Sequence, residues 1–139
     1  RWLSNADVTD TLKAISAKHV MVVADSCYSG TLTRSAKRGL KLEPRTPDYI
    51  TKMLGKKTRT ALTSGGLEPV VDRGGEGHSV FAKAFLDALG DNKGVMDGTQ
   101  MFTRVRQQVR LNADQTPQYS NIRLAGHEVG GDFLFVRRK

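Results

Sequence analysis

A single cysteine, Cys27, follows a short apolar segment and is surrounded by small polar residues. Residues 25–30 have the sequence Asp-Ser-Cys-Tyr-Ser-Gly. A cysteine that serves only as a small buried hydrophobe usually lies inside an apolar segment rather than after it. A thiol has a reference pKa near ~8.5 and attacks a carbonyl carbon as the thiolate, so it needs a nearby base or positive charge at neutral pH. The polar surroundings favour a nucleophile, although position alone leaves a structural cysteine open.

The segment before Cys27 predicts the strand that positions it. Residues 19–24 form a continuous apolar run rich in β-branched side chains, which is typical of a strand buried on both faces. Further upstream, Ser4 and Asp7 have the spacing of a capping box and predict the start of a helix that ends near Lys18.

A second strand is predicted over residues 58–63, and residues 64–66 (Ser-Gly-Gly) follow it directly. In open α/β sheets, functional groups gather at the carboxyl ends of the strands. Asp25 and residues 64–66 are therefore expected to face one cleft. Residues 69–72 form a candidate edge strand with which another extended segment could pair.

The rest of the chain predicts three helices and a last strand. A short helix is expected over residues 48–54, a longer amphipathic helix follows the capping residue Ser79, and another covers residues 99–110. The last strand is predicted over residues 132–136. Strands alternating with helices indicate an α/β fold with a largely parallel sheet, and 139 residues suit one domain. The residues expected to face the core from the two long helices are Phe81, Phe85, Leu89, Met101, Val105 and Val109.

The chain is basic, with a formal net charge of +8. Nine of its 22 basic residues fall between Arg34 and Arg59, against two acids, Glu43 and Asp48. Such a stretch is usually a solvated basic loop, and the alternative is a patch for nucleic acid or an acidic partner. Tyr49 is the one aromatic residue in it, so a stacking platform for nucleic acid is not indicated.

Composition and cysteine count indicate the compartment. No apolar run approaches the roughly 18 residues of a membrane helix, so no membrane partner is expected. One cysteine cannot form a disulfide within the chain, and a cytoplasmic protein is therefore expected. No metal-ligand or phosphate-loop spacing is present, so neither a metal nor a cofactor is expected.

Residues 19–30 are similar to the nucleophile strand of metacaspases and bacterial orthocaspases, which are caspase-like cysteine peptidases of family C14. Residues 61–66 and 77–89 resemble the start of the caspase small-subunit region, where a strand, a substrate-binding loop and a helix follow in that order. The resemblance spans nearly the whole chain. The animal caspase motif Gln-Ala-Cys-x-Gly does not occur here, which places the chain with the prokaryotic relatives.

The resemblance implies an α/β fold of the caspase type, a three-layer sandwich with a mostly parallel central sheet. The chain would be the C-terminal part of that single domain and would lack its N-terminal strands. Its parts would be a nucleophile-strand region (residues 1–30), a basic processing or linker loop (residues 31–57) and a small-subunit-like region (residues 58–139).

The implied activity is that of a cysteine endopeptidase acting on polypeptides through a Cys-His dyad with Cys27 as nucleophile. In caspases the histidine lies roughly 50 residues before the cysteine. Only 26 residues precede Cys27, so the histidine is expected upstream of this chain, on the N-terminal portion of the same domain or on a separate chain. His19, His78 and His127 are poor substitutes by position.

The resemblance also implies specificity for Arg or Lys before the cleaved bond. In basic-specific relatives an acid two residues before the nucleophile lines the S1 pocket, and that position is Asp25 here. Glu68 resembles an acid of the paracaspase pocket, and Asp72 is an alternative on the same loop. A carboxylate suits a guanidinium or ammonium group. Ser64 and Gly65 are expected to line the cleft.

Basic specificity gives the basic loop a second meaning, because caspases are cut between their subunits in this region. The candidate self-cleavage sites are Lys37, Arg38, Lys41 and Arg45. The first acid after Cys27 is Glu43, so this part of the chain is not expected to require calcium.

Two other functions stay open. One is an inactive homologue that acts as a binding or regulatory module, against which the intact Cys27 and Asp25 argue. The other is a basic nucleic-acid-binding domain, whose affinity would fall steeply with salt and would survive Cys27→Ala.

Overall fold

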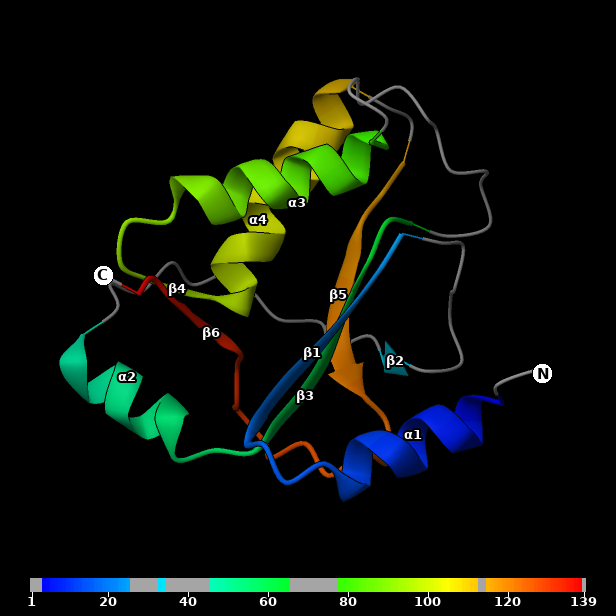
Figure 1. Cartoon of the computed structure of the whole chain (residues 1–139), viewed down its shortest axis with the longest axis vertical. Coiled ribbons are helices and arrows are strands. Elements are labelled where there is room, and N and C mark those ends of the chain that lie inside the picture. Colours follow the sequence, from blue (N-terminus) through cyan, green and yellow to red (C-terminus); the bar gives the residue numbers. More distant parts are fainter. Residues whose placement is uncertain (1–3, 26–32, 35–45, 66–77, 113–114, 139) are drawn as a thin grey trace.

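The structure is a computed structural model that describes residues 4–25, 33–34, 46–65, 78–112 and 115–138 (Figure 1). Its larger sheet has the strand order β1 (His19–Ala24), β3 (Thr58–Thr63), β5 (Gln118–Ile122) and β2 (Thr33–Arg34). The bounds of β1 and β3 are those predicted from their apolar and β-branched sequences. β1 is parallel to β3, whereas β5 is antiparallel to both β3 and β2. Among the described strands the sheet is therefore mixed, not largely parallel.

Helices pack against both faces of this sheet. Side chains alternate along a strand, so Ala61 and Leu62 of β3 point to opposite faces. Ala61 packs with Leu12 of helix α1 (Asn5–Ala14), while Leu62 belongs to the larger core under α3 (Val80–Asp91) and α4 (Gly98–Asn112). The predicted core-facing residues of α4 are all fully buried, namely Met101, Val105 and Val109. The sequence thus identified the inner face of α4 correctly.

A small second sheet lies beside α2 (Pro47–Leu54) in Figure 1. It joins β4 (Val95–Asp97) and β6 (Leu134–Val136) in antiparallel register. α2 and β6 were predicted, whereas β4 and β5 were not. In the part of the chain that the structure describes, no helix has the length and apolar character needed to cross a membrane.

The end of the first helix and the burial of the first strand differ from their predictions. The capping box of Ser4 and Asp7 is present, but α1 ends at Ala14 and Ile15 takes an extended conformation. β1 is partly buried rather than buried on both faces, and Val23 is 39% exposed. Within the described residues β1 pairs with β3 alone, so it forms an edge of the sheet there.

The buried side chain of Arg59 fixes α1 and the start of β1 against β3. Its guanidinium donates hydrogen bonds to the carbonyl oxygens of Leu12 (2.8 Å), Ile15 (2.8 Å) and Lys18 (3.0 Å). These carbonyls lie at and after the end of α1, where a helix has unpaired acceptors and a negative dipole end. Arg59 was counted with the solvated basic residues in the sequence, and for this residue that interpretation is wrong.

A second buried polar cluster connects α4 with β5. Asp132 accepts hydrogen bonds from the backbone N–H and hydroxyl of Thr99, at 3.1 and 2.7 Å, and from the hydroxyl of Tyr119 at 2.5 Å. Asp97 accepts one from the hydroxyl of Tyr49 at 3.0 Å. Both carboxylates are almost completely buried, and their partners compensate part of the cost of burial.

Candidate active site

The carboxyl ends of β1 and β3 lie side by side. The parallel register pairs Ala24, the last residue of β1, with Thr63, the last residue of β3. Beyond these residues the backbone N–H of Ser64 donates to the carbonyl oxygen of Ala24 at 3.1 Å. Asp25 and Ser64 therefore follow their strands at the same end of the sheet, the end formed by the strand carboxyl termini, where α/β folds place their functional groups.

Helix α3 begins at this same end of the sheet (Figure 1). Its N-cap is Ser79, as predicted, and the Ser79 hydroxyl oxygen accepts the backbone N–H of Ala82 at 3.0 Å. The same hydroxyl donates a hydrogen bond to Oδ2 of Asp25. Asp25 is exposed, whereas Ser79 is only 7% exposed. The exposed carboxylate is thus held by a buried hydroxyl that belongs to the first turn of a helix.

The contact between Asp25 and Ser79 was not predicted from the sequence. The two residues are 54 positions apart, and Ser79 carried a local signal for a helix cap only. A second hint was available in principle, because the cap of the helix that follows β3 should lie near the strand ends in an α/β unit.

Gly65 brings the end of β3 close to the segment before β5. Its φ is +150°, and a β-carbon placed there would lie 3.3 Å from the backbone N and O of Thr116. Other residues would be strained in this conformation. Ser64 beside it is 1% exposed. That Ser64 and Gly65 line a cleft stays a prediction.

Most of the predicted site residues lie outside the described residues. They are the nucleophile Cys27, the pocket acids Glu68 and Asp72, and the candidate self-cleavage residues Lys37, Arg38, Lys41 and Arg45. Their roles stay predictions. Of the predicted acids, Asp25 is the one that the structure describes.

The three histidines divide between the two ends of the sheet. His19 is the first residue of β1, and its Nε2 lies 2.9 Å from the carbonyl oxygen of Met53. His127 accepts the backbone N–H of Arg59 through Nδ1 at 2.9 Å, near the start of β3. Both are therefore about 20 Å from the end of the sheet that carries Asp25, at ~3.3 Å per strand residue. The exposed His78 directly precedes Ser79 and lies at the same end of the sheet as Asp25.

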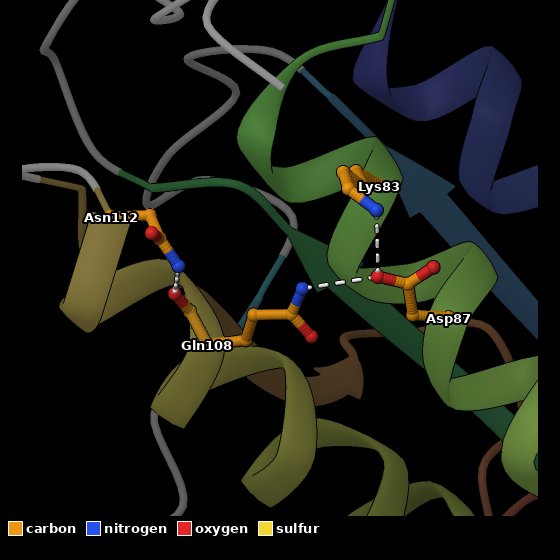
Figure 2. A network of polar contacts seen from close by, with 4 residues as sticks. All are labelled: Lys83, Asp87, Gln108 and Asn112. Atoms are coloured by element: carbon orange, nitrogen blue, oxygen red, sulfur yellow. Dashed lines mark hydrogen bonds and ion pairs between the residues drawn. The ribbon is translucent and has the colours of Figure 1, made fainter. Parts of the chain in front are cut away.

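A polar contact between α3 and α4 fixes the position of α3 about two turns after its cap (Figure 2). Oδ2 of Asp87 accepts hydrogen bonds from Lys83 and Gln108, both at 3.1 Å, and Asn112 donates to the carbonyl oxygen of Gln108 at 2.9 Å. The hydrogen bond from Gln108, and then that from Lys83, lower the pKa of Asp87. In the described part of the chain, no group of three or more His, Cys, Asp or Glu residues could hold a metal ion.

Comparison with known protein families is consistent with this geometry. A family model described as the caspase domain of peptidase C14 matches residues 2–126, a range that includes both strand ends, Cys27 and Ser79. Searches of curated proteins and of solved structures found no match. The family suggests a peptidase-type hydrolase, and the mixed α/β structure is consistent with its fold. Because the match covers most of the sequence, the chain belongs to the caspase-domain family of C14 peptidases.

Proposed function

We propose that the chain is part of a cysteine endopeptidase that cleaves polypeptides after Arg or Lys, with Cys27 as the nucleophile. The observation that carries this proposal is Asp25. Asp25 is exposed at the end of the sheet where β1 and β3 both finish, and Ser79 holds its carboxylate. Asp25 also stands two residues before Cys27 in the sequence. A carboxylate fixed beside a nucleophile provides the opposite charge for a basic side chain before the cleaved bond.

The proposed reaction is acyl transfer to a thiol. The Cys27 thiolate attacks the scissile carbonyl carbon, and a histidine imidazolium gives its proton to the leaving amine. Water then hydrolyses the thioester and releases the N-terminal product. The backbone N–H of Cys27 would donate to the oxyanion. We propose that the histidine comes from a segment upstream of this chain, as the family resemblance implies. His19 and His127 lie at the opposite end of the sheet from Asp25, and His78 is the one described histidine at the same end.

The partner of this chain would be the N-terminal portion of the same caspase-like domain. The outer edge of β1 pairs with no described strand, and an open strand edge presents unpaired N–H and C=O groups. A strand from the N-terminal portion, parallel to β1, would satisfy them and would cover the half-exposed Val23. The complete domain would then have the three-layer form and mostly parallel central sheet that the resemblance implies.

Further parts of the proposal concern residues around the cleft. Glu68 or Asp72 would add a second acid to the S1 pocket, and Ser64 and Gly65 would contact the substrate. The basic residues of the 31–57 segment would serve as processing sites of a cytoplasmic enzyme that needs no cofactor. The enzyme would act in the manner of metacaspases and orthocaspases.

The test is hydrolysis of short fluorogenic peptides that end in Arg, Lys or Asp. The full-length protein is compared with its Cys27→Ser, Asp25→Asn and Asp10→Asn variants, with and without calcium. Asp10 is an exposed acid of α1 and serves as the control for loss of a surface charge. We expect cleavage after Arg and Lys that Cys27→Ser abolishes. Asp25→Asn should reduce it by roughly 100-fold, because the bound basic side chain loses the opposite charge as well as charge-assisted hydrogen bonds.

Cleavage after Asp alone would keep the peptidase and remove the proposed role of Asp25. Absence of cleavage under every condition would replace the proposal with an inactive, regulatory homologue.

A further inference from the structure

We propose that Ser79 is a positioning residue that orients the carboxylate of Asp25 and thereby sets the preference for Arg over Lys at S1. This inference rests on the proposed function, since it assigns a task to a residue beside the proposed S1 acid. Ser79 itself would not touch the substrate.

The hydroxyl of Ser79 accepts one hydrogen bond and donates another, and the two bonds fix its orientation. Its oxygen accepts the N–H of Ala82, and its one proton goes to Oδ2 of Asp25. The carbonyl oxygen of Ser79 accepts the N–H of Lys83 at 3.0 Å, so its backbone is tied to the same helix turn. A side chain that is 7% exposed has little water to replace these partners. The orientation of the hydroxyl is therefore set by α3.

Asp25 shows the complementary arrangement. It is exposed, and among the described residues its Oδ1 accepts no hydrogen bond. One oxygen is thus anchored, while the other has no hydrogen-bond partner among the described residues. The carboxylate also lies at the N-terminus of α3, where negative charge is favourable. Without Ser79, an exposed aspartate would rotate freely and would lose that freedom again on binding substrate.

The geometry separates two basic ligands. A guanidinium group binds a carboxylate best through two parallel hydrogen bonds in one plane, which requires a defined carboxylate orientation. An ammonium group is a compact charge with three rotatable donors and tolerates a rotated carboxylate. Loss of the Ser79 hydroxyl should therefore weaken binding of Arg substrates more than that of Lys substrates.

Ser79 also caps α3, and substitutions can separate the two tasks. Thr keeps both the cap and the hydroxyl donor, Gly is tolerated as an N-cap but has no donor, and Ala has neither the cap nor the donor. Thr46 provides a matched control, because its side chain caps α2 through the N–H of Tyr49 at 3.2 Å. Thr46→Gly makes the same kind of change away from Asp25.

The experiment measures kcat and KM for matched Arg and Lys peptides with the full-length wild type and with Ser79→Gly, Ser79→Ala, Ser79→Thr and Thr46→Gly. Thermal unfolding shows which variants fold, and Ser79→Ala serves if Ser79→Gly does not. We expect the two donor-lacking variants to raise KM for the Arg peptide roughly 10-fold, as for one lost hydrogen bond to a charged group, with kcat little changed. In these two variants kcat/KM for the Arg peptide, divided by that for the Lys peptide, should fall below the wild-type ratio. Ser79→Thr should keep the wild-type ratio.

The inference is overturned if the wild type cleaves after Arg and Lys, Cys27→Ser is inactive, and a folded Ser79→Gly or Ser79→Ala variant keeps the wild-type KM and ratio. An equal effect of Thr46→Gly would also overturn it, because the change would then report helix capping. A wild type that cleaves nothing would instead overturn the proposed function itself.

Discussion

The hydroxyl of Tyr119 donates a 2.5 Å hydrogen bond to Oδ1 of Asp132 and so joins β5 to the segment that holds the start of α4. Burial raises the pKa of Asp132 above its ordinary value near 3.8, and the charge of Asp97 raises it further, while hydrogen bonds from Tyr119 and Thr99 oppose the shift. The pKa of Tyr119 is likewise raised well above 10.0, first by burial and then by Asp132. The pair therefore resists ionisation in the folded state.

Asp132 should make the stability of the protein depend on pH. A carboxyl group with a raised folded pKa binds its proton more tightly in the folded than in the unfolded state. Its contribution to the free energy of unfolding therefore falls as pH rises above about 3.8, and it levels off above the folded pKa. Asp132→Asn cannot titrate. Urea unfolding at several pH values should show wild-type stability falling relative to Asp132→Asn over this window. A difference that rises with pH would contradict the raised pKa.

Gly98 should not tolerate a side chain, because Tyr119 and Asp132 fill the space beside it. A β-carbon at Gly98 would lie 2.0 Å from the Tyr119 hydroxyl oxygen and 2.6 Å from Oδ1 of Asp132. We expect Gly98→Ala to lower the free energy of unfolding by about 2 kcal/mol or more through overpacking. Gly90 in α3 is the control, since a β-carbon there would meet nothing within 4 Å. Gly90→Ala should stabilise by about 0.5–1 kcal/mol. Equal effects of the two substitutions in chemical denaturation would contradict this account.

The strands next to the site could be predicted because local signals agreed there. β1 and β3 are continuous runs rich in β-branched residues, and Asp25 and Ser64 end them abruptly. β5 has the polar sequence Gln-Tyr-Ser-Asn-Ile, and no strand is predicted there from the sequence. Its strand conformation comes from pairing with β3, and such tertiary context overrides intrinsic propensity.

The buried polar contacts could not be predicted for a related reason. Arg59 belongs to a strongly basic stretch, and its burial follows from the carbonyl groups that α1 and the following turn place around it. The contact of Ser79 with Asp25 likewise depends on the packing of α3 beside the strand ends. Neither partner set is close in sequence, so no local pattern contains it.

Arg59 should be needed for the stability of the α1–β1 region. The planar guanidinium reaches several carbonyl groups at once, which a single ammonium group cannot reproduce. We expect Arg59→Lys to lower the free energy of unfolding by about 2–4 kcal/mol, since buried carbonyl acceptors lose partners. Arg104→Lys on the exposed surface of α4 is the matched control and should change stability by less than about 0.5 kcal/mol. A small effect of Arg59→Lys in denaturant titrations would show that lysine or water replaces those contacts.

His78 provides a test of where the catalytic base lies. It is exposed and lies at the same end of the sheet as Asp25, so it is the best-placed of the three histidines for the role. If the histidine is supplied by the upstream segment, His78→Ala should keep kcat and KM for an Arg peptide within about 2-fold. His78 would then take no part in the reaction, and an exposed substitution usually changes the stability of the fold by less than about 0.5 kcal/mol. A loss comparable to that of Cys27→Ser would instead place the base at His78. Ser79→Thr, measured alongside, would distinguish loss of a base from disturbance of the α3 cap.

Self-processing should occur in the basic segment if the enzyme cleaves after Arg or Lys. The candidate positions are Lys37, Arg38, Lys41 and Arg45. Intact mass analysis of the purified protein should show fragments that end at one or more of these residues. The Cys27→Ser variant should stay whole, which distinguishes self-cleavage from cleavage by host proteases. A variant with all four residues changed to Gln should also stay whole and still cleave an Arg peptide, provided that processing is not required for activity. Identical fragments from the wild type and Cys27→Ser would show that other proteases cut this segment.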